Sequence, residues 1–229
     1  NQTDVGTVTA TDGDTSDTLT YSLTGTDASS FSINSSSGVI TFDSAPDYET
    51  LTWGQPSYSI TVTASDGVNT DTQALTITIT NVNDVAPVIT SSATFSIAEN
   101  QTAVGTVTAT DTDYLGYGFS YSLSGTDASL FSISTLSQQI AVVYPNGTTS
   151  YPTALVAVIT FNSAPDYETK TSYSITMTVS DGINTTSQAL ALTITDVNEA
   201  PTDIALSGGS AAENSAGASF GTLSTTDQD

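Results

Sequence analysis

The sequence repeats itself at the length of a domain. The stretch TYSLTGTDASSFSI at 20–33 returns as SYSLSGTDASLFSI at 120–133, and SYSITVTASDGVNT at 57–70 returns as SYSITMTVSDGINT at 172–185. The period is 99 residues from Asp12 to Asp111. This period is much longer than that of a solenoid repeat, so each copy is expected to enclose a hydrophobic core of its own.

Within each copy, apolar residues alternate with Ser and Thr along short stretches, for example at 57–65, 75–79, 172–180 and 190–194. An alternation with period 2 predicts half-buried β-strands, and no window shows helical spacing. About seven such strands per copy, separated by turn signals such as Asp-Gly, are typical of a Greek-key sandwich. The sequence therefore predicts an all-β fold of tandem Greek-key β-sandwiches of immunoglobulin-like type.

The repeats predict three domains: 1–86, lacking its first strand; 87–200; and 201–229, the start of a third copy. Ile33 and Ile40 are 7 positions apart, whereas Ile133 and Ile159 are 26 apart, so the second copy carries 19 extra residues. Apolar runs flank Asn146-Gly147 there, which predicts a protruding β-hairpin. We interpret the chain as a window from a longer tandem array.

The charge balance is strongly acidic. There are 24 Asp and Glu against one basic residue, Lys170, with no His and no Cys, giving a net charge of −23. Nothing can neutralise phosphates, so nucleic acid and anionic membrane surfaces are excluded as partners, and cations are expected instead. Without His or Cys the usual nucleophile–base pairs cannot be built, so enzymatic activity is not expected. No stretch is long and apolar enough to predict membrane insertion of this segment.

The acids recur at the same places in successive copies. These places are an Asp-x-Asp after the second strand, an Asp-Tyr-Glu inside SAPDYET (44–50 and 163–169), an Asp-Gly turn, an inter-repeat Asx-rich segment and a Glu-Asn at the repeat start. The candidate metal ligands are Asp12, Asp14, Asp47, Glu49, Asp66, Asn81, Asn83, Asp84, Glu99, Asp111, Asp113, Asp166, Glu168, Asp181, Asp196, Asn198, Glu199, Asp227 and Asp229.

Carboxylates and amides without bases are hard oxygen donors, and Ca²⁺ takes six to eight such oxygens. Alternating spacings such as Asp-x-Asp allow two side chains to face one ion. Asp and Asn also favour turns without any ion, which is the alternative interpretation. Ordered recurrence at five places, in a chain with almost no other charge, favours calcium.

The order Glu-Asn, Asp-x-Asp, Asp-Tyr-Glu, Asp-Gly and Asx-x-Asn-Asp/Glu-(x)-Ala-Pro resembles cadherin repeats in their bacterial form. The resemblance implies cadherin-type sandwiches with calcium ions at each junction between repeats. It assigns Asp47, Glu49, Asn81, Asn83, Asp84, Asp111, Asp113 and Asp181 to the first junction. It assigns Glu99, Asp166, Glu168, Asp196, Asn198, Glu199, Asp227 and Asp229 to the second. Asp12, Asp14 and Asp66 hold the places in the first copy that Asp111, Asp113 and Asp181 hold in the second.

The expected function is that of a calcium-rigidified extender or adhesion segment of a large bacterial cell-surface or secreted adhesin, located outside the cell. A repeating subunit of an extracellular filament, and a spacer or carbohydrate-binding module of a secreted enzyme, are the alternatives. Trp53, the only tryptophan, is the candidate glycan-binding residue; packing on its own domain is the other interpretation. Homophilic protein contacts and glycans are the further candidate partners.

Overall fold

The computed structural model describes residues 2–14, 17–51, 56–113, 118–139, 141–143, 147, 149–150, 153–210, 213, 217 and 221–227. The chain divides into two compact units, residues 1–84 with 142–150, and residues 85–141 with 151–229. The candidate metal ligand Asp229 and the candidate glycan-binding residue Trp53 lie outside the described residues.

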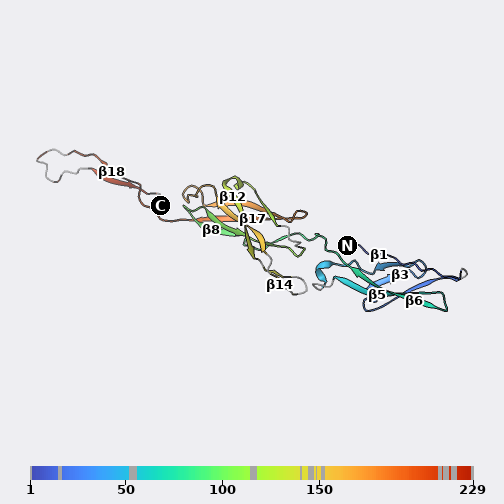
Figure 1. The fold of residues 1–229 in the computed structure, drawn as a ribbon. Coiled ribbons are helices and arrows are strands. Elements are labelled where there is room, and N and C mark those ends of the chain that lie inside the picture. The colour runs from blue at the N-terminus through green and yellow to red at the C-terminus, as the bar shows by residue number, and fades with distance from the viewer. Residues whose placement is uncertain are drawn as a thin grey trace. The chain divides into compact units, whose positions relative to one another are not determined.

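The first unit contains two three-stranded antiparallel sheets. One has the order β1 (Asp4–Thr7), β4 (Val39–Phe42), β3 (Phe31–Ile33), and the other has the order β2 (Thr20–Thr24), β5 (Ser57–Ser65), β6 (Thr70–Thr78). Two short 3-10 helices, η1 (Ala28–Ser30) and η2 (Tyr48–Thr50), lie in the connections. Both sheets can be followed in Figure 1.

The core of the first unit forms where the two sheets face each other. Phe31, Ile40 and Phe42 come from one sheet and Ile60 and Val62 from the other, and all five are buried. The rings of Phe31 and Phe42 lie 4.4 Å apart between their centroids. Burial of alternate residues from both sheets produces a sandwich, as the period-2 pattern predicts.

The second unit has the same plan with one strand more. A four-stranded sheet has the order β11 (Ser120–Ser124), β16 (Ser172–Ser180), β17 (Thr185–Thr195), β8 (Thr94–Ala98), and a three-stranded sheet has the order β12 (Phe131–Gln139), β15 (Thr153–Phe161), β9 (Ala103–Val107). Strand β8 runs parallel to β17, whereas the other pairs are antiparallel. The 3-10 helix η3 (Ala128–Leu130) precedes β12.

Three small strand pairs complete the described structure. They are β7 (Val88–Ile89) with β10 (Ala109–Thr110), β13 (Val142–Val143) with β14 (Thr149–Ser150), and β18 (Asp203–Ser207) with β19 (Thr222–Thr226). The extra residues of the second copy extend the β12–β15 ladder as far as Gln139 and Thr153. The predicted hairpin tip includes Asn146, which lies outside the described residues; β13 and β14 pair on either side of it.

The prediction of an all-β fold is confirmed. The described residues form strands and three single-turn 3-10 helices, with no α-helix among them. In β16 the buried positions are Ile175, Met177 and Val179, which are the apolar members of the alternation. In the part of the chain that the structure describes, no helix is long and apolar enough to cross a membrane.

Candidate metal centres

Three glutamates meet at one end of the second unit. The carboxylate oxygens of Glu99, Glu168 and Glu199 lie within 4.8 Å of one another. Glu99 directly follows β8, Glu168 follows β15 within the Asp-Tyr-Glu motif, and Glu199 lies in the segment after β17. The fold therefore brings together acids from three places that are far apart in the sequence. We call Glu99, Glu168 and Glu199 the glutamate triad.

Glu99 is the buried member of the triad, with 2% of its surface exposed. Its Oε2 accepts a hydrogen bond from the backbone N–H of Tyr167 at 2.8 Å, and its Oε1 accepts one from the backbone N–H of Val197 at 2.8 Å. The two N–H donors fix the direction of the carboxylate. Glu99 thereby ties the Asp-Tyr-Glu turn to the segment after β17.

The asparagine of the Glu-Asn pair, Asn100, shapes the turn after Glu99 and contacts Glu199. Asn100 has φ of 62°, in the left-handed region that Asn tolerates better than most residues. Its N–H donates to the carbonyl of Pro165 at 3.0 Å, and its side-chain amide donates to Glu199. The Glu-Asn motif thus positions two members of the triad.

The negative charge of the glutamate triad is not balanced by a basic side chain. The pKa of Glu168 is raised: a backbone hydrogen bond favours the carboxylate, but desolvation and the nearby charges of Glu99 and Asp166 outweigh it. The only basic side chain, Lys170, forms an ion pair with Asp127 instead. A set of carboxylate oxygens with no base suits a hard cation, and Ca²⁺ fits this donor chemistry. Glu99, Glu168 and Glu199 are the residues that would hold it.

Other acids predicted for the second junction lie outside the triad. Asp166 accepts hydrogen bonds from the N–H and Oγ1 of Thr169, at 3.3 and 2.9 Å, and these contacts hold the pKa of its carboxyl below the usual value. Asp196, Asn198 and Asp227 are exposed. The Nδ2 of Asn198 donates to the carbonyl of Glu199 at 3.3 Å.

A second acidic group lies at the start of the second unit. Asp111, Asp113 and Asp181 are 3%, 1% and 9% exposed, respectively. The N–H of Asp113 donates to Asp111 Oδ1 at 2.9 Å, and the N–H of Val85 donates to Asp113 Oδ2 at 2.5 Å. The pKa of Asp111 is raised to about 6, chiefly by burial; the N–H of Asp113 lowers it, and the charges of Asp113 and Asp181 raise it.

Asn184 makes a polar contact near these acids, and the sequence analysis did not name it among the candidate residues. Its Nδ2 donates to the carbonyl of Val85 at 3.2 Å, while Asp181 Oδ1 accepts the N–H groups of Ile183 and Asn184 at 2.7 and 2.6 Å. The turn around Asp181 therefore holds the segment that begins at Val85. The recurrence of Asp-Gly-x-Asn, at 66–69 and 181–184, was the available signal.

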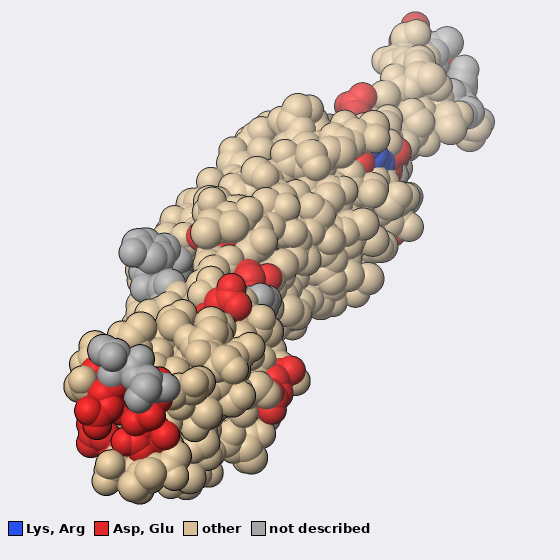
Figure 2. All heavy atoms as spheres, turned by 90° about the vertical axis from the view of Figure 1, so that its right-hand side faces the viewer, with Lys and Arg blue, Asp and Glu red and all other residues tan. Residues whose placement is uncertain are grey.

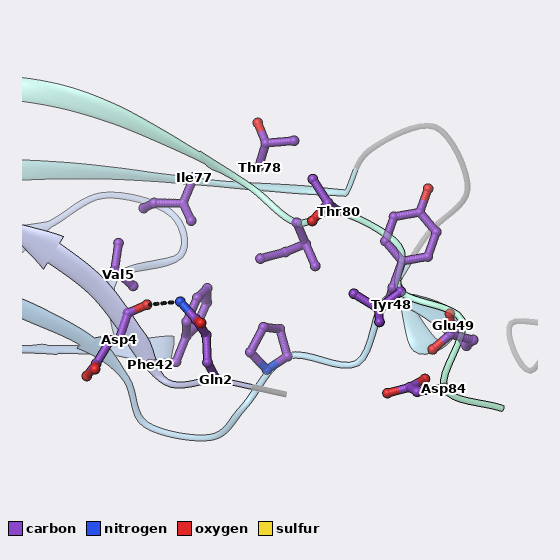
Figure 3. Close-up of a pocket in the computed structure, with 13 residues that line it drawn as sticks. Gln2, Asp4, Val5, Phe42, Tyr48, Glu49, Ile77, Thr78, Thr80 and Asp84 are labelled. Atoms are coloured by element: carbon purple, nitrogen blue, oxygen red, sulfur yellow. Dashed lines mark hydrogen bonds between the residues drawn. The ribbon is translucent and has the colours of Figure 1, made fainter. Parts of the chain in front are cut away.

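In the first unit, Glu49 and Asp84 face each other across one end of a groove (Figure 3), with carboxylate oxygens within 4.8 Å. Asp47 instead caps η2, because its Oδ1 accepts the N–H of Glu49 at 3.1 Å. Asn81 and Asn83, in the segment leading to Asp84, are half-buried. Of the Asp-Tyr-Glu motif, the glutamate joins another acid and the aspartate shapes the turn, as in the second unit.

The remaining candidates of the first unit are Asp12, Asp14 and Asp66. The N–H of Asp14 donates to Asp12 Oδ1 at 2.9 Å, which repeats the contact between Asp113 and Asp111. Backbone N–H groups of Asn69 and Val68 lower the pKa of Asp66. Asp12, Asp66 and Asp71 line one groove of the first unit. Figure 2 shows acidic patches on a surface that is otherwise almost uncharged.

The comparison with protein families gives the class of the chain. The sequence profile described as "Cadherin domain" matches residues 1–80 and 93–195. These residues are more than half of the sequence, so the chain belongs to the cadherin domain family. The two matched segments confirm the prediction that the chain contains tandem cadherin repeats.

Individual relatives agree with this assignment. Protocadherin Fat 4 of Mus musculus is 32% identical over 184 residues, which are 76% of this chain and 3% of the relative. Cadherin-related family member 2 of Mus musculus is 38% identical over 99 residues, which are 43% of this chain and 7% of the relative. The chain thus spans a small part of these curated relatives. Both are mouse proteins, so they support the family and not its bacterial form.

A solved structure supports the fold. The structure titled "Protocadherin gammaB7 EC3-6 cis-dimer structure" aligns with a TM-score of 0.64 and 25% sequence identity. The alignment covers 100% of this chain and 51% of that chain. The two units are therefore similar to cadherin extracellular repeats in their strand arrangement.

Proposed function

We propose that this chain is a calcium-binding extender or adhesion segment of a large bacterial cell-surface or secreted protein, in which calcium stiffens the connection between successive repeats. The observation that carries the proposal is the glutamate triad. Three carboxylates meet there, one of them buried, in a chain whose only base is paired elsewhere. Such an arrangement is unfavourable without a cation and favourable with one.

Calcium binding would convert mutual repulsion into cross-linking. Glu99 is bonded to the Asp-Tyr-Glu turn and to the segment after β17, so an ion on the triad would bind all three segments of the second unit together. The ligand sets of both junctions, with Asp111, Asp113 and Asp181 in the first, stay predictions. Their supporting observations are the burial of these three aspartates and their contacts with the segment at Val85.

The extracellular setting follows from the family, whose repeats are extracellular domains. The bacterial setting rests on the sequence resemblance alone. A solved relative is described as a cis-dimer, and homophilic contact of this chain is part of the proposal. Sedimentation of the purified chain with calcium would measure such contact directly.

A calorimetric calcium titration of the full chain tests the proposal. We expect saturable binding, and a triple variant with Glu99→Gln, Glu168→Gln and Glu199→Gln should bind at least one ion fewer. The matched control is Asp203→Asn, which neutralises an exposed carboxylate outside the recurring acidic places. Equal ion counts in the triple variant and the wild type would reject the triad as a calcium site.

X-ray scattering then tests stiffening. With calcium the chain should give a narrower distribution of dimensions than with chelator, because the converging carboxylates repel each other when no ion is bound. Superimposable profiles in the two conditions would leave binding intact and reject the mechanical function.

A further inference from the structure

The insertion in the second copy lengthens one edge strand. In the first unit the edge strand β3 covers three residues, Phe31–Ile33, and the chain then turns at Asn34, whose Oδ1 accepts two backbone N–H groups. In the second unit the corresponding strand β12 covers nine residues, Phe131–Gln139, and pairs with β15 over all nine (Figure 1). Among the described residues β12 is the last strand of its sheet, so its outer side has no partner strand there.

The hydrogen bonds to β15 show which backbone groups of β12 point outward. The N–H of Asn162 donates to the carbonyl of Leu130 at 2.9 Å, one position before the first residue pair of the ladder. Bonded and non-bonded pairs alternate along an antiparallel ladder. The even-numbered residues of β12 therefore bond to β15, whereas Thr135 and Ser137 direct their N–H and C=O groups away from it.

β12 has none of the features that usually keep an edge strand from pairing. Natural edge strands are short, charged, interrupted by proline or distorted by a bulge. β12 has the sequence FSISTLSQQ, without charge or proline, and its register with β15 is continuous. All residues from Ser134 to Gln139 are exposed, including Leu136 at 57%. A further strand can therefore reach this edge.

The sequence around β12 is the longest uncharged stretch of the chain. No charged residue occurs from Ala128 to Pro165, although the net charge of the chain is −23. The acid that precedes this stretch, Asp127, forms an ion pair with Lys170, the only base. Two acidic copies repel each other where their carboxylates approach. An uncharged edge is therefore the surface on which a second copy of this chain can dock.

We propose that β12 pairs with β12 of a second copy of this chain, as an antiparallel strand across a two-fold axis. The two three-stranded sheets would then form one continuous sheet. An antiparallel pair of identical strands is self-complementary, as a two-fold interface between identical chains requires. This contact rests on the proposed function in one respect, since it gives a surface to the homophilic contact proposed above.

The outward groups and the exposed leucine favour one register. With Leu136 opposite the partner's Leu136, Thr135 lies opposite the partner's Ser137, and each outward N–H meets an outward C=O. The two leucines then form a non-bonded pair, in which opposite side chains are closest. Main-chain hydrogen bonds supply affinity, and the leucine pair fixes the register. Such a contact is smaller than the interface of a stable dimer, so each one is weak and several in a tandem array act together.

Amide hydrogen exchange of the full chain tests the pairing, measured by NMR at low and at high protein concentration in chelator. Exchange at Thr135 and Ser137 should slow at least tenfold once the dimer predominates. Exchange at Leu136 should change little, because its N–H already bonds to β15. Sedimentation equilibrium of the same samples should show monomers and dimers.

Two results of this experiment would overturn the proposal. The first is a dimer in which exchange at Thr135 and Ser137 stays fast. The second is a chain that stays monomeric at every concentration, in which case the edge of β12 would be left to a strand of another sequence.

Variants at one position make the test specific. Ser137→Pro removes an N–H that points away from β15, so the monomer keeps its hydrogen bonds, as edge strands with proline do. The dimer loses one main-chain hydrogen bond from each copy, which should raise the dissociation constant about tenfold. The matched control Ser137→Thr keeps the N–H and should dimerise like the wild type. Equal dissociation constants for the two variants would contradict the strand pairing.

A second variant does not depend on how the strand tolerates proline. Leu136→Glu changes an exposed side chain, so the monomer should fold normally. In the dimer it would set two carboxylates opposite each other, and like charges directly opposite are destabilising. The dissociation constant should again rise at least tenfold, and an unchanged value would reject the proposed register.

Calcium separates this contact from the proposed metal function. Strand pairing needs no ion, so the dimer should persist in chelator. Dimers of a chain that binds no calcium would support the pairing and reject the calcium function. Calcium binding by a chain that stays monomeric would do the reverse. Dimers that dissociate in chelator would also overturn the pairing, because the contact would then run through the acids.

Discussion

The substitution Glu99→Gln separates a calcium ligand from a structural hydrogen-bond acceptor. Gln keeps the size of the side chain and one carbonyl oxygen, but its NH₂ cannot accept a hydrogen bond. One of the two bonds from Tyr167 and Val197 is therefore lost. A hydrogen bond to a charged, buried group contributes about 1.5–3 kcal/mol.

The loss of charge acts in the opposite direction when no ion is bound. For the pair Glu99 and Glu199, whose oxygens lie within 4.8 Å, Coulomb's law with an effective dielectric constant of about 20 gives about 3 kcal/mol of repulsion. Gln removes this repulsion. Glu168 lies within the same distance of Glu99, so Gln removes that repulsion as well. In chelator the gain therefore outweighs the lost hydrogen bond, and the free energy of unfolding should not fall.

With calcium the balance changes, because the ion already compensates the repulsion. Only losses remain: the hydrogen bond, and a calcium affinity reduced by at least about tenfold, which lowers stability by about 1.4 kcal/mol at saturating calcium. Together these lower the free energy of unfolding by about 3 kcal/mol, or the melting temperature of the second unit by roughly 10 °C.

Differential scanning calorimetry of wild type, Glu99→Gln and the control Asp203→Asn, each in calcium and in chelator, measures both effects. Asp203→Asn should match the wild type in both conditions, since that aspartate is exposed and lies outside the recurring acidic places. An equal loss of stability for Glu99→Gln in calcium and in chelator would refute the reasoning, because Glu99 would then act only as an acceptor for two N–H groups.

Three further predictions follow from buried or paired side chains. In chelator, the free energy of unfolding of the wild type should rise as the pH falls from 7 to 5. The pKa of Asp111 is raised from 3.8 to about 6 in the folded state, so the folded protein takes up this proton at a higher pH than the unfolded chain does. Asp111→Asn should flatten this profile, and parallel melting curves against pH would contradict it. Ile97→Ala should lower the free energy of unfolding of the second unit by about 2–5 kcal/mol, since Ile97 is 5% exposed, and chemical denaturation with an unchanged midpoint would count against β8 as a core strand. Lys170→Met should raise the pKa of Asp127, which the Lys170 hydrogen bond holds below its usual value. It should also lower the free energy of unfolding by no more than about 1 kcal/mol at pH values above that pKa. An unchanged pKa of Asp127, measured by NMR, would show that the ion pair does not persist in solution.

The strands could be predicted from the sequence because their signal is local. The alternation at 172–180 exposes Ser and Thr and buries Ile175, Met177 and Val179 in β16. The β-strand is the regular backbone conformation that places alternate residues on one face, so a period of 2 predicts a strand. The repeat then multiplies the evidence, since the same pattern occurs twice.

The acids show where local reasoning ends. The spacing of Asp-Tyr-Glu predicted that both acids face an ion. In the structure Asp166 bonds to Thr169 within its own turn, and Glu168 joins the triad. Asp47 and Glu49 divide in the same way. The spacing allows an extended or a turning segment, and the structure shows that this segment turns. That both acids of the motif bind one ion stays a prediction.

The sequence by itself determined the all-β class, the repeating plan and the positions at which acids gather, because each depends on periodicity or composition along the chain. Only the tertiary structure decided that Glu99 is buried between two backbone donors, Tyr167 and Val197, which are 68 and 98 residues away. It alone decided that β8 joins its sheet as a strand parallel to β17. Both depend on contacts between distant segments, and such contacts form only when the sheets pair and pack.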